Sequence, residues 1–250
     1  MAFDIPMSGH SKWAQIKHQK GAADSKRGQL FGKLARNISV AAREGKDLET
    51  NFKLRLAIDK AKAINMPHDT IERALLRGAG ELAGQQQLTE VIYEAYGPAG
   101  SAFIIIANTD NKNRTTSQIR HILSKHNGAI TETGSVGWNF EIRGVIKVKS
   151  LKLKVKRLEN FELQMIDLGV VDIKPTDQNV LVYTFLTDLQ KIKEAIVKAD
   201  IEIESADIEY VPKNKLELDD EDNEKVLQLI SALEEEEEVV EVFSNVSNQV

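Results

Sequence analysis

The chain has 250 residues, 42% of them hydrophobic and 28% charged, and it carries a formal net charge of −5. This composition is that of a folded globular protein and excludes a disordered or fibrous chain. The absence of cysteine excludes disulfide bonds, thiol catalysis and cysteine-ligated metal clusters. The longest apolar run, 102–107, is too short to cross a bilayer, and the first residues show no signal-peptide pattern.

Charge is distributed unevenly along the chain. Residues 8–77 carry fifteen Lys and Arg against seven Asp and Glu, a net charge of +8. Residues 200–250 carry three against seventeen, a net charge of −14. Solubility and chance clustering are one explanation. A basic block of this size favours the other, an anionic partner for the N-terminal part, most commonly nucleic acid.

Apolar residues at helical spacing predict three helices in the first 80 residues. One lies around 28–44, and a second carries Leu54 and Ile58 on one face. Pro67 ends the second helix and opens a third, which stops near Gly78. Two helices joined by a short Pro-containing turn resemble a helix-turn-helix in outline, an outline that also occurs in helical domains that bind nothing.

The rest of the chain changes to the period of strands. Strands are predicted near 91–96, 103–107, 136–148 with an interruption at Gly144, 170–173, 180–186, 201–211 and 239–243. Helices are predicted near 114–126, 156–168, 187–199 and 220–233. The fold class predicted is therefore α+β, with a helical bundle followed by two small α+β domains, the last inserted into the middle one. The predicted bounds are 1–80 for the basic helical domain, 81–136 plus 206–250 for the discontinuous domain, and 137–205 for the insertion.

Two clusters of cations are candidate nucleic-acid contacts. A glycine-containing leader and the first helix carry Lys12, Trp13, Lys17, Lys20, Lys26, Arg27, Lys33, Arg36 and Arg43. Lysines in such a stretch can neutralise phosphates and release counterions, while Trp13 can stack on an unpaired base or anchor the leader. The second cluster, Lys112 and Arg114, opens a helix at the end of a strand, where backbone amides can hold a phosphate. The alternative is that Asp110 and the neighbouring asparagines only cap the helix.

No catalytic constellation is present in the sequence. The five histidines lack metal-ligand spacing, and no nucleophile motif, phosphate loop or dinucleotide fingerprint occurs. We therefore expect no enzyme activity, no metal, no cofactor and no small-molecule substrate. The five glutamates 234–238 form a solvated helix end or, alternatively, an acidic surface that folds back on the basic region.

Ten short motifs, taken in order, resemble the YebC/PmpR family, whose mitochondrial relatives are translational activators of cytochrome oxidase. They lie at residues 9–13, 23–28, 40–45, 65–67, 71–74, 96–98, 109–115, 134–136, 212–214 and 242–245. The resemblance implies three domains, a cytoplasmic location, no catalysis and a role as a DNA-binding transcriptional regulator. Other members of the family act at the ribosome on difficult sequences such as consecutive prolines, so a translation factor that contacts RNA is the main alternative. We expect a monomer.

The chain departs from the family pattern at three places. Ala95 and Ala99 replace two glycines, and Asn51 is followed by Phe52 instead of Pro. The region 150–180 is the least similar. At its start lies a cationic cluster of Lys147, Lys149, Lys152, Lys154, Lys156 and Arg157. Those lysines are explained equally by a second anionic contact or by protection of an edge strand. A nuclease and a protein that only binds other proteins through its acidic end remain further alternatives.

Overall fold

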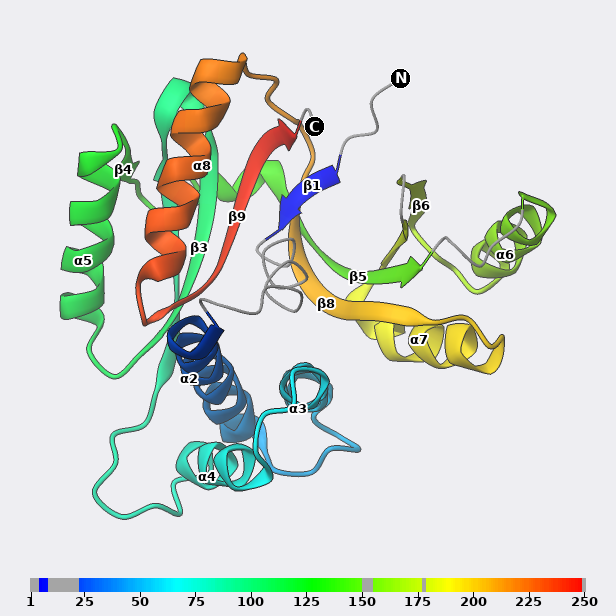
Figure 1. Cartoon of the computed structure of the whole chain (residues 1–250), viewed down its shortest axis with the longest axis horizontal. Helices are drawn as coiled ribbons and strands as arrows, with labels where there is room; N and C mark the ends of the chain where they lie inside the picture. The colour runs from blue at the N-terminus through cyan, green and yellow to red at the C-terminus, as the bar shows by residue number, and fades with distance from the viewer. Residues whose placement is uncertain (1–4, 9–22, 150–154, 177–178, 249–250) are drawn as a thin grey trace. The chain divides into compact units, whose positions relative to one another are not determined.

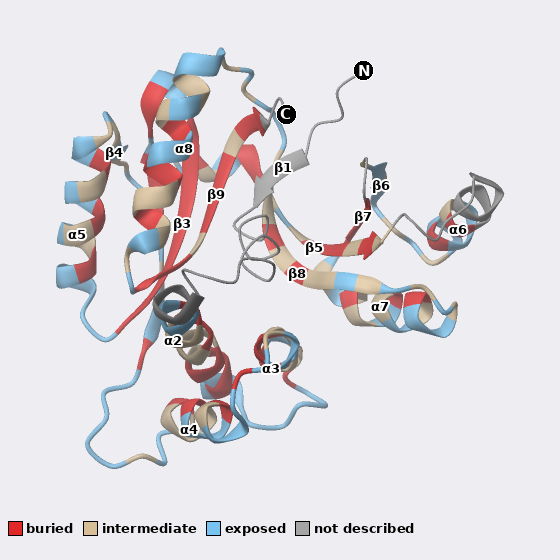
Figure 2. Ribbon diagram, viewed as in Figure 1, coloured by how far each residue is buried: buried red, intermediate tan, exposed pale blue. Residues whose placement is uncertain are grey.

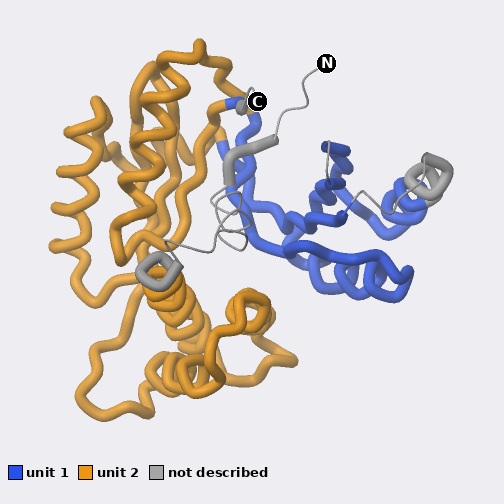
Figure 3. The backbone as a smooth tube through the Cα atoms, viewed as in Figure 1, with its two compact units in different colours: residues 1–6, 140–213, 247–250 blue, residues 7–139, 214–246 orange. Residues whose placement is uncertain are grey.

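The computed structural model describes residues 5–8, 23–149, 155–176 and 179–248 (Figure 1). Its elements divide into two compact units (Figure 3). The larger unit contains residues 7–139 and 214–246, and the smaller unit contains residues 140–213 with 1–6 and 247–250. Helices and two antiparallel sheets are both present, which confirms the predicted α+β class.

The larger unit begins with three helices, α2 (Ala23–Ala41), α3 (Phe52–Ala63) and α4 (His68–Gly78). These confirm the three predicted helices. Their facing apolar stripes form one core, which includes Leu34, Ile38, Leu54, Ile58 and Ile71. A Cβ at Gly78 would lie 2.1 Å from the carbonyl oxygen of Ser39, so glycine is what allows α4 to approach α2 this closely.

The first sheet has the strand order β1-β9-β3-β2-β4. Its strands are β1 (Ile5–Ser8), β2 (Thr89–Tyr96), β3 (Ala102–Thr109), β4 (Ala129–Ile130) and β9 (Val239–Asn248). Strand β3 is buried along its whole length (Figure 2). Two helices, α5 (Lys112–Lys125) and α8 (Asp220–Glu235), pack on the sheet and complete its core around Phe103, Leu123 and Leu229.

The smaller unit contains a second sheet with the order β6-β7-β5-β8. Its elements are β5 (Phe140–Lys149), α6 (Val155–Asp167), β6 (Asp172–Pro175), β7 (Asn179–Thr184), α7 (Leu189–Lys198) and β8 (Ile203–Pro212). The predicted interruption at Gly144 is wrong, because β5 runs through that residue. A Cβ there would lie 2.4 Å from Thr184 Oγ1, so glycine serves close packing within a continuous strand.

Strand pairing places the boundary of the smaller unit later than the predicted one. Strand β8 pairs with β5 from Pro212 opposite Phe140 to Ile203 opposite Val148. Residues 206–212, predicted in the discontinuous domain, therefore lie in the second sheet. The predicted strand at 136–148 also begins later, because residues 137–139 form a short 3-10 turn.

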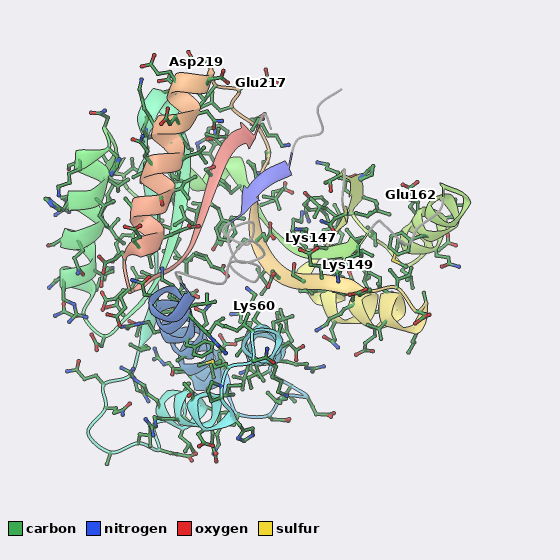
Figure 4. All side chains as sticks on the ribbon, viewed as in Figure 1. Lys60, Lys147, Lys149, Glu162, Glu217 and Asp219 are labelled. Carbon is green, nitrogen blue, oxygen red and sulfur yellow. The ribbon has the colours of Figure 1, made fainter. Side chains whose placement is uncertain are left out.

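The lysines of β5 do not protect an edge. Strand β5 lies between β7 and β8, so the edge explanation is wrong for its two lysines, Lys147 and Lys149. The side chains of the rest of the cluster, Lys152, Lys154, Lys156 and Arg157, lie outside the described part of the structure. Lys147 instead pairs with Glu204 at 3.0 Å, and Lys149 pairs with Glu202. Figure 4 labels the two lysines. Such exposed or half-exposed pairs contribute little to stability.

Candidate nucleic-acid interface

Part of the predicted binding surface lies outside the described residues. Lys12, Trp13, Lys17 and Lys20 belong to the segment 9–22, and the side chain of Lys26 is also outside the described part. Their role in binding stays a prediction. The next residue, Arg27, is exposed, and its guanidinium carbon lies 5.2 Å from the centre of the Phe31 ring. This cation–π contact leaves Arg27 at the surface near the start of α2.

Lys33 has a structural role that the helical wheel of α2 does not reveal. Its side chain is buried, and its Nζ donates hydrogen bonds to the carbonyl oxygens of Glu234 at 2.5 Å and Val239 at 2.6 Å. A wheel places Lys33 opposite the apolar stripe, but it cannot show that the connection between α8 and β9 covers this side. We therefore leave Lys33 out of the proposed binding surface.

The other two predicted cations of this helical region also contact the protein itself. Arg36 Nη2 lies 2.6 Å from Glu237 Oε1, and its Nη1 donates a long hydrogen bond of 3.4 Å to the carbonyl of Asn108. Arg43 Nη1 donates to the carbonyl of Leu88 at 2.8 Å. Both side chains hold the helical bundle to neighbouring segments of the larger unit.

The acidic stretch that follows α8 folds back on the basic region, one of the two alternatives left by the sequence. Besides the Arg36–Glu237 pair, Lys60 of α3 lies 3.1 Å from Glu241 of β9 (Figure 4 labels Lys60). The sequence gives no indication of the second pair, because 181 residues separate its members. Two acidic side chains of the C-terminal part are thus paired with two cations of the helical bundle.

The start of α5 is capped by the chain's own groups. Asn111 Oδ1 accepts from the backbone N–H of Arg114 at 3.1 Å, as a helix cap does. The buried carboxylate of Glu238 accepts hydrogen bonds from the hydroxyls of Thr109 and Thr115 and from the guanidinium of Arg114. Glu238 therefore occupies the position of an anion at this helix start, which supports the capping interpretation. Lys112, by contrast, is exposed.

Several exposed cations of the helical bundle were not among the predicted contacts. Lys62 on α3 and Arg73 on α4 are exposed. Lys46 and Lys53 form exposed ion pairs with Glu81 and Glu44, at 2.5 and 3.1 Å. Pairs of this kind are typically worth less than about 1 kcal/mol, so a phosphate can replace the carboxylate at little cost. We call Arg27, Lys46, Lys53, Lys62 and Arg73 the exposed bundle cations. Arg27 is among the predicted contacts, whereas only the net charge of the segment indicates the other four.

Within the described ranges, no group of three or more His, Asp or Glu side chains is arranged to hold a metal ion. Nor does any helix of those ranges combine the length and apolarity needed to cross a membrane.

The structure contains a helical bundle with basic side chains on its surface and two sheets with helices packed on them. It is therefore an α+β protein with a basic helical bundle. Two family models match its sequence: the TACO1/YebC protein N-terminal domain over residues 11–81, and the TACO1/YebC second and third domain over residues 88–246. The chain therefore belongs to the TACO1/YebC family, which confirms the resemblance found in the sequence.

Relatives match along nearly the full chain. A protein of Pseudothermotoga lettingae is 49% identical over 240 residues, covering 96% of this chain and 93% of its own. One of Thermotoga maritima is 47% identical with the same coverage. Both bear the name "Probable transcriptional regulatory protein". The crystal structure of a conserved hypothetical protein from Aquifex aeolicus matches with a TM-score of 0.82 at 41% identity, covering 96% of this chain and 98% of that one.

Proposed function

We propose that the chain is a regulator of gene expression that binds DNA through phosphate contacts made by its basic N-terminal part. The observation that carries this proposal is the net charge of +8 over residues 8–77. The structure uses Lys33, Arg36 and Arg43 internally but leaves the exposed bundle cations at the surface. The names of the relatives support a role in transcription. In this proposal the protein is cytoplasmic and monomeric and performs no catalysis.

The first test removes five cations at the start of the chain. Changing Lys12, Lys17, Lys20, Lys26 and Arg27 to Ala is expected to weaken binding to duplex DNA at least about tenfold. The slope of log K against log salt should fall by about 0.9 for each phosphate that the variant no longer neutralises. Fluorescence anisotropy titrations at several salt concentrations measure both quantities, and thermal melting verifies the fold.

A matched control removes the same charge elsewhere. Changing Lys147, Lys149, Lys174, Lys191 and Lys198 of the smaller unit to Ala alters the net charge equally and should leave the salt slope unchanged. If both variants lose affinity alike, the effect is one of overall charge and the proposed surface is wrong. Unchanged affinity in the folded leader variant would also refute it.

The second test concerns sequence preference. Major-groove readout uses Arg, Asn and Gln side chains reaching base edges from one helix face, whereas Arg36 and Arg43 are bound to acceptors of the protein. Binding should therefore rest on phosphates, and we expect less than about a hundredfold preference for a selected site over random duplex, below the roughly thousandfold floor of specific regulators. Competition titrations at near-physiological salt measure this ratio.

Selection of a site with thousandfold preference would contradict this expectation and identify a dedicated promoter-binding protein. The protein could instead show only slight sequence preference among duplex DNA sites and sediment tightly with ribosomes in a nuclease-sensitive manner. That result would replace the DNA proposal by a translation role. Hydrolysis of nucleic acid by the purified protein with added divalent metals would contradict the absence of catalysis.

A further inference from the structure

A small pocket in the larger unit is separate from the basic bundle. It has a volume of about 290 Å³. Ligand pockets occupy roughly 300–1,000 Å³, so this one suits a small group better than a large molecule. Its walls come from segments far apart in sequence, and they include Tyr96, Val136, Trp138, Asn214, Lys215 and Asn245.

Two aromatic rings at this pocket are exposed. Trp138 is 62% exposed and Tyr96 is 42% exposed. Both polar atoms are directed to one acceptor: Trp138 Nε1 donates to the carbonyl oxygen of Ser135 at 3.0 Å, and the Tyr96 hydroxyl donates to the same oxygen at 3.2 Å. This arrangement fixes the edges of the rings, so that ring surface is what they offer to a ligand.

Amide groups form the polar part of the pocket. Asn214 donates its backbone N–H and its Nδ2 to Asn139 Oδ1, at 3.0 and 3.1 Å. Asn245 Oδ1 accepts from the backbone N–H of Ala102 at 2.8 Å. These bonds use Asn214 Nδ2 and Asn245 Oδ1 and hold both side-chain amides in place at the pocket. Amide side chains both donate and accept hydrogen bonds, as the edges of nucleobases do.

The pocket wall is held in place by a buried carboxylate. Glu94 accepts hydrogen bonds at 2.7 Å from the backbone N–H groups of Gly134, Val136 and Gly137. The backbone of Gly137 approaches this carboxylate closely, because a Cβ there would lie 3.0 Å from Glu94 Oε1. The turn that carries Ser135 and leads to Trp138 is therefore fixed before any ligand arrives, which lowers the entropic cost of binding.

Four of the sequence motifs meet at this pocket, and the proposed phosphate surface uses none of them. Tyr96 comes from the motif at 96–98, Val136 from 134–136, Asn214 from 212–214 and Asn245 from 242–245. The positively charged Lys215 also lies at the pocket. Exposed rings, amide side chains and a cation together are the components of sites that stack an unpaired base and hold its adjoining backbone.

We propose that this pocket binds an unpaired nucleobase of a single-stranded nucleic acid, by stacking on Trp138. The inference rests on the proposed function, since it requires a chain that binds nucleic acid. It goes beyond it because duplex DNA keeps its bases stacked on one another and cannot fill the pocket. The protein would then have two modes of contact, phosphates at the bundle and a base at the pocket.

Intrinsic fluorescence tests the pocket directly. The chain contains two tryptophans, so in a Trp13→Phe background Trp138 is the sole tryptophan. A short oligonucleotide without self-complementarity is titrated as a single strand and as a blunt duplex, in DNA and RNA versions. We expect the single strand to quench Trp138 emission and the duplex to leave it unchanged. The version that quenches at lower concentration identifies the preferred backbone.

Substitutions in the otherwise native chain provide the second readout. Trp138→Ala should weaken single-strand binding about tenfold to a hundredfold while duplex binding stays unchanged. Trp138→Phe should recover most of the affinity, because it keeps a ring. Asn214→Ala should weaken single-strand binding to a smaller extent. The control is Phe185→Ala, which removes a 52% exposed ring from the smaller unit and should change nothing.

The outcomes distinguish a failure of the pocket inference from a failure of the proposed function. Binding of duplex by the native chain, with equal single-strand affinity in the native and Trp138→Ala proteins, would overturn the pocket alone. Equal quenching by single strand and duplex would overturn it as well. If the native chain binds neither form at any salt concentration, the proposed function itself is wrong.

Discussion

A chain that ends at residue 213 should fail to fold its first sheet. The truncation removes α8 and β9, and β9 pairs with β3 through residues such as Val242 opposite Ile105. It also removes seven buried apolar side chains from the core of the larger unit: Val226, Leu229, Ile230, Leu233, Val239, Val242 and Val246. At roughly 1.5–3 kcal/mol each, their removal amounts to about 10–20 kcal/mol, which exceeds the typical stability of a domain, about 5–15 kcal/mol.

The opposite deletion should be tolerated. Residues 139 and 214 flank the smaller unit, and Asn139 Nδ2 donates to the carbonyl of Asn214 at 3.1 Å while Asn139 Oδ1 accepts from the Asn214 N–H. A short glycine linker can therefore replace residues 140–213 without moving either end. We expect this variant to be soluble and to melt cooperatively, whereas the truncated chain aggregates. Soluble yield and thermal unfolding followed by circular dichroism measure the contrast.

A third variant distinguishes the boundary seen in strand pairing from the boundary predicted from the sequence. Deleting 137–205 leaves residues 206–212 of β8 without β5, their partner. An unpaired strand exposes backbone donors and acceptors and favours aggregation. This variant should therefore be less soluble than the one that lacks 140–213. Equal behaviour of the two deletions, or a soluble and cooperative truncation at 213, would contradict the arrangement of the two units.

The sequence predicted most of the elements because their patterns are local. Apolar spacing located the helices of the bundle, and alternation located the strands, since both periodicities depend only on near neighbours. The strand predicted from Val136 onward is wrong over its first residues. Trp138 alternates with apolar residues, as in a strand, but it lies in a turn. Because the alternation was extended into this turn, the exposed ring of Trp138 was placed in a strand.

The site was harder to predict because its contacts are distant in sequence. Glu238 looked like one solvated glutamate in a run of five, yet it is buried at the start of α5, 124 residues from Arg114. Lys33 looked like a surface cation, yet its acceptors are more than 200 residues away. Charge counts predict that a segment is basic. They cannot predict which of its cations the protein neutralises itself, because that depends on the tertiary fold.

The ionisation of Glu94 also depends on contacts that only the tertiary fold creates, and a pH titration can measure their effect. The residue is 9% exposed in β2. Burial by itself raises the pKa of its carboxyl group, but the hydrogen bonds from Gly134, Val136 and Gly137 outweigh burial and hold the pKa below its ordinary value of 4.5. The ionised carboxylate of Glu94 is therefore more stable in the folded state than in the unfolded state.

Glu94→Gln should destabilise the larger unit by about 3 kcal/mol at neutral pH, because an amide offers the three N–H donors only one neutral acceptor. This corresponds to a fall of about 6–12 °C in Tm. The stabilisation that the carboxylate provides is complete above the unfolded-state pKa and is lost as the pH falls through the lower folded-state pKa. The difference in Tm between the native and variant proteins should therefore be constant near neutrality and shrink below about pH 4.5. Glu132→Gln, an exposed carboxylate in the same segment, is the control and should leave Tm unchanged. A difference that persists undiminished into acid would mean that Gln is poorly packed at position 94, and that the charge of Glu94 does not hold the turn that leads to Trp138.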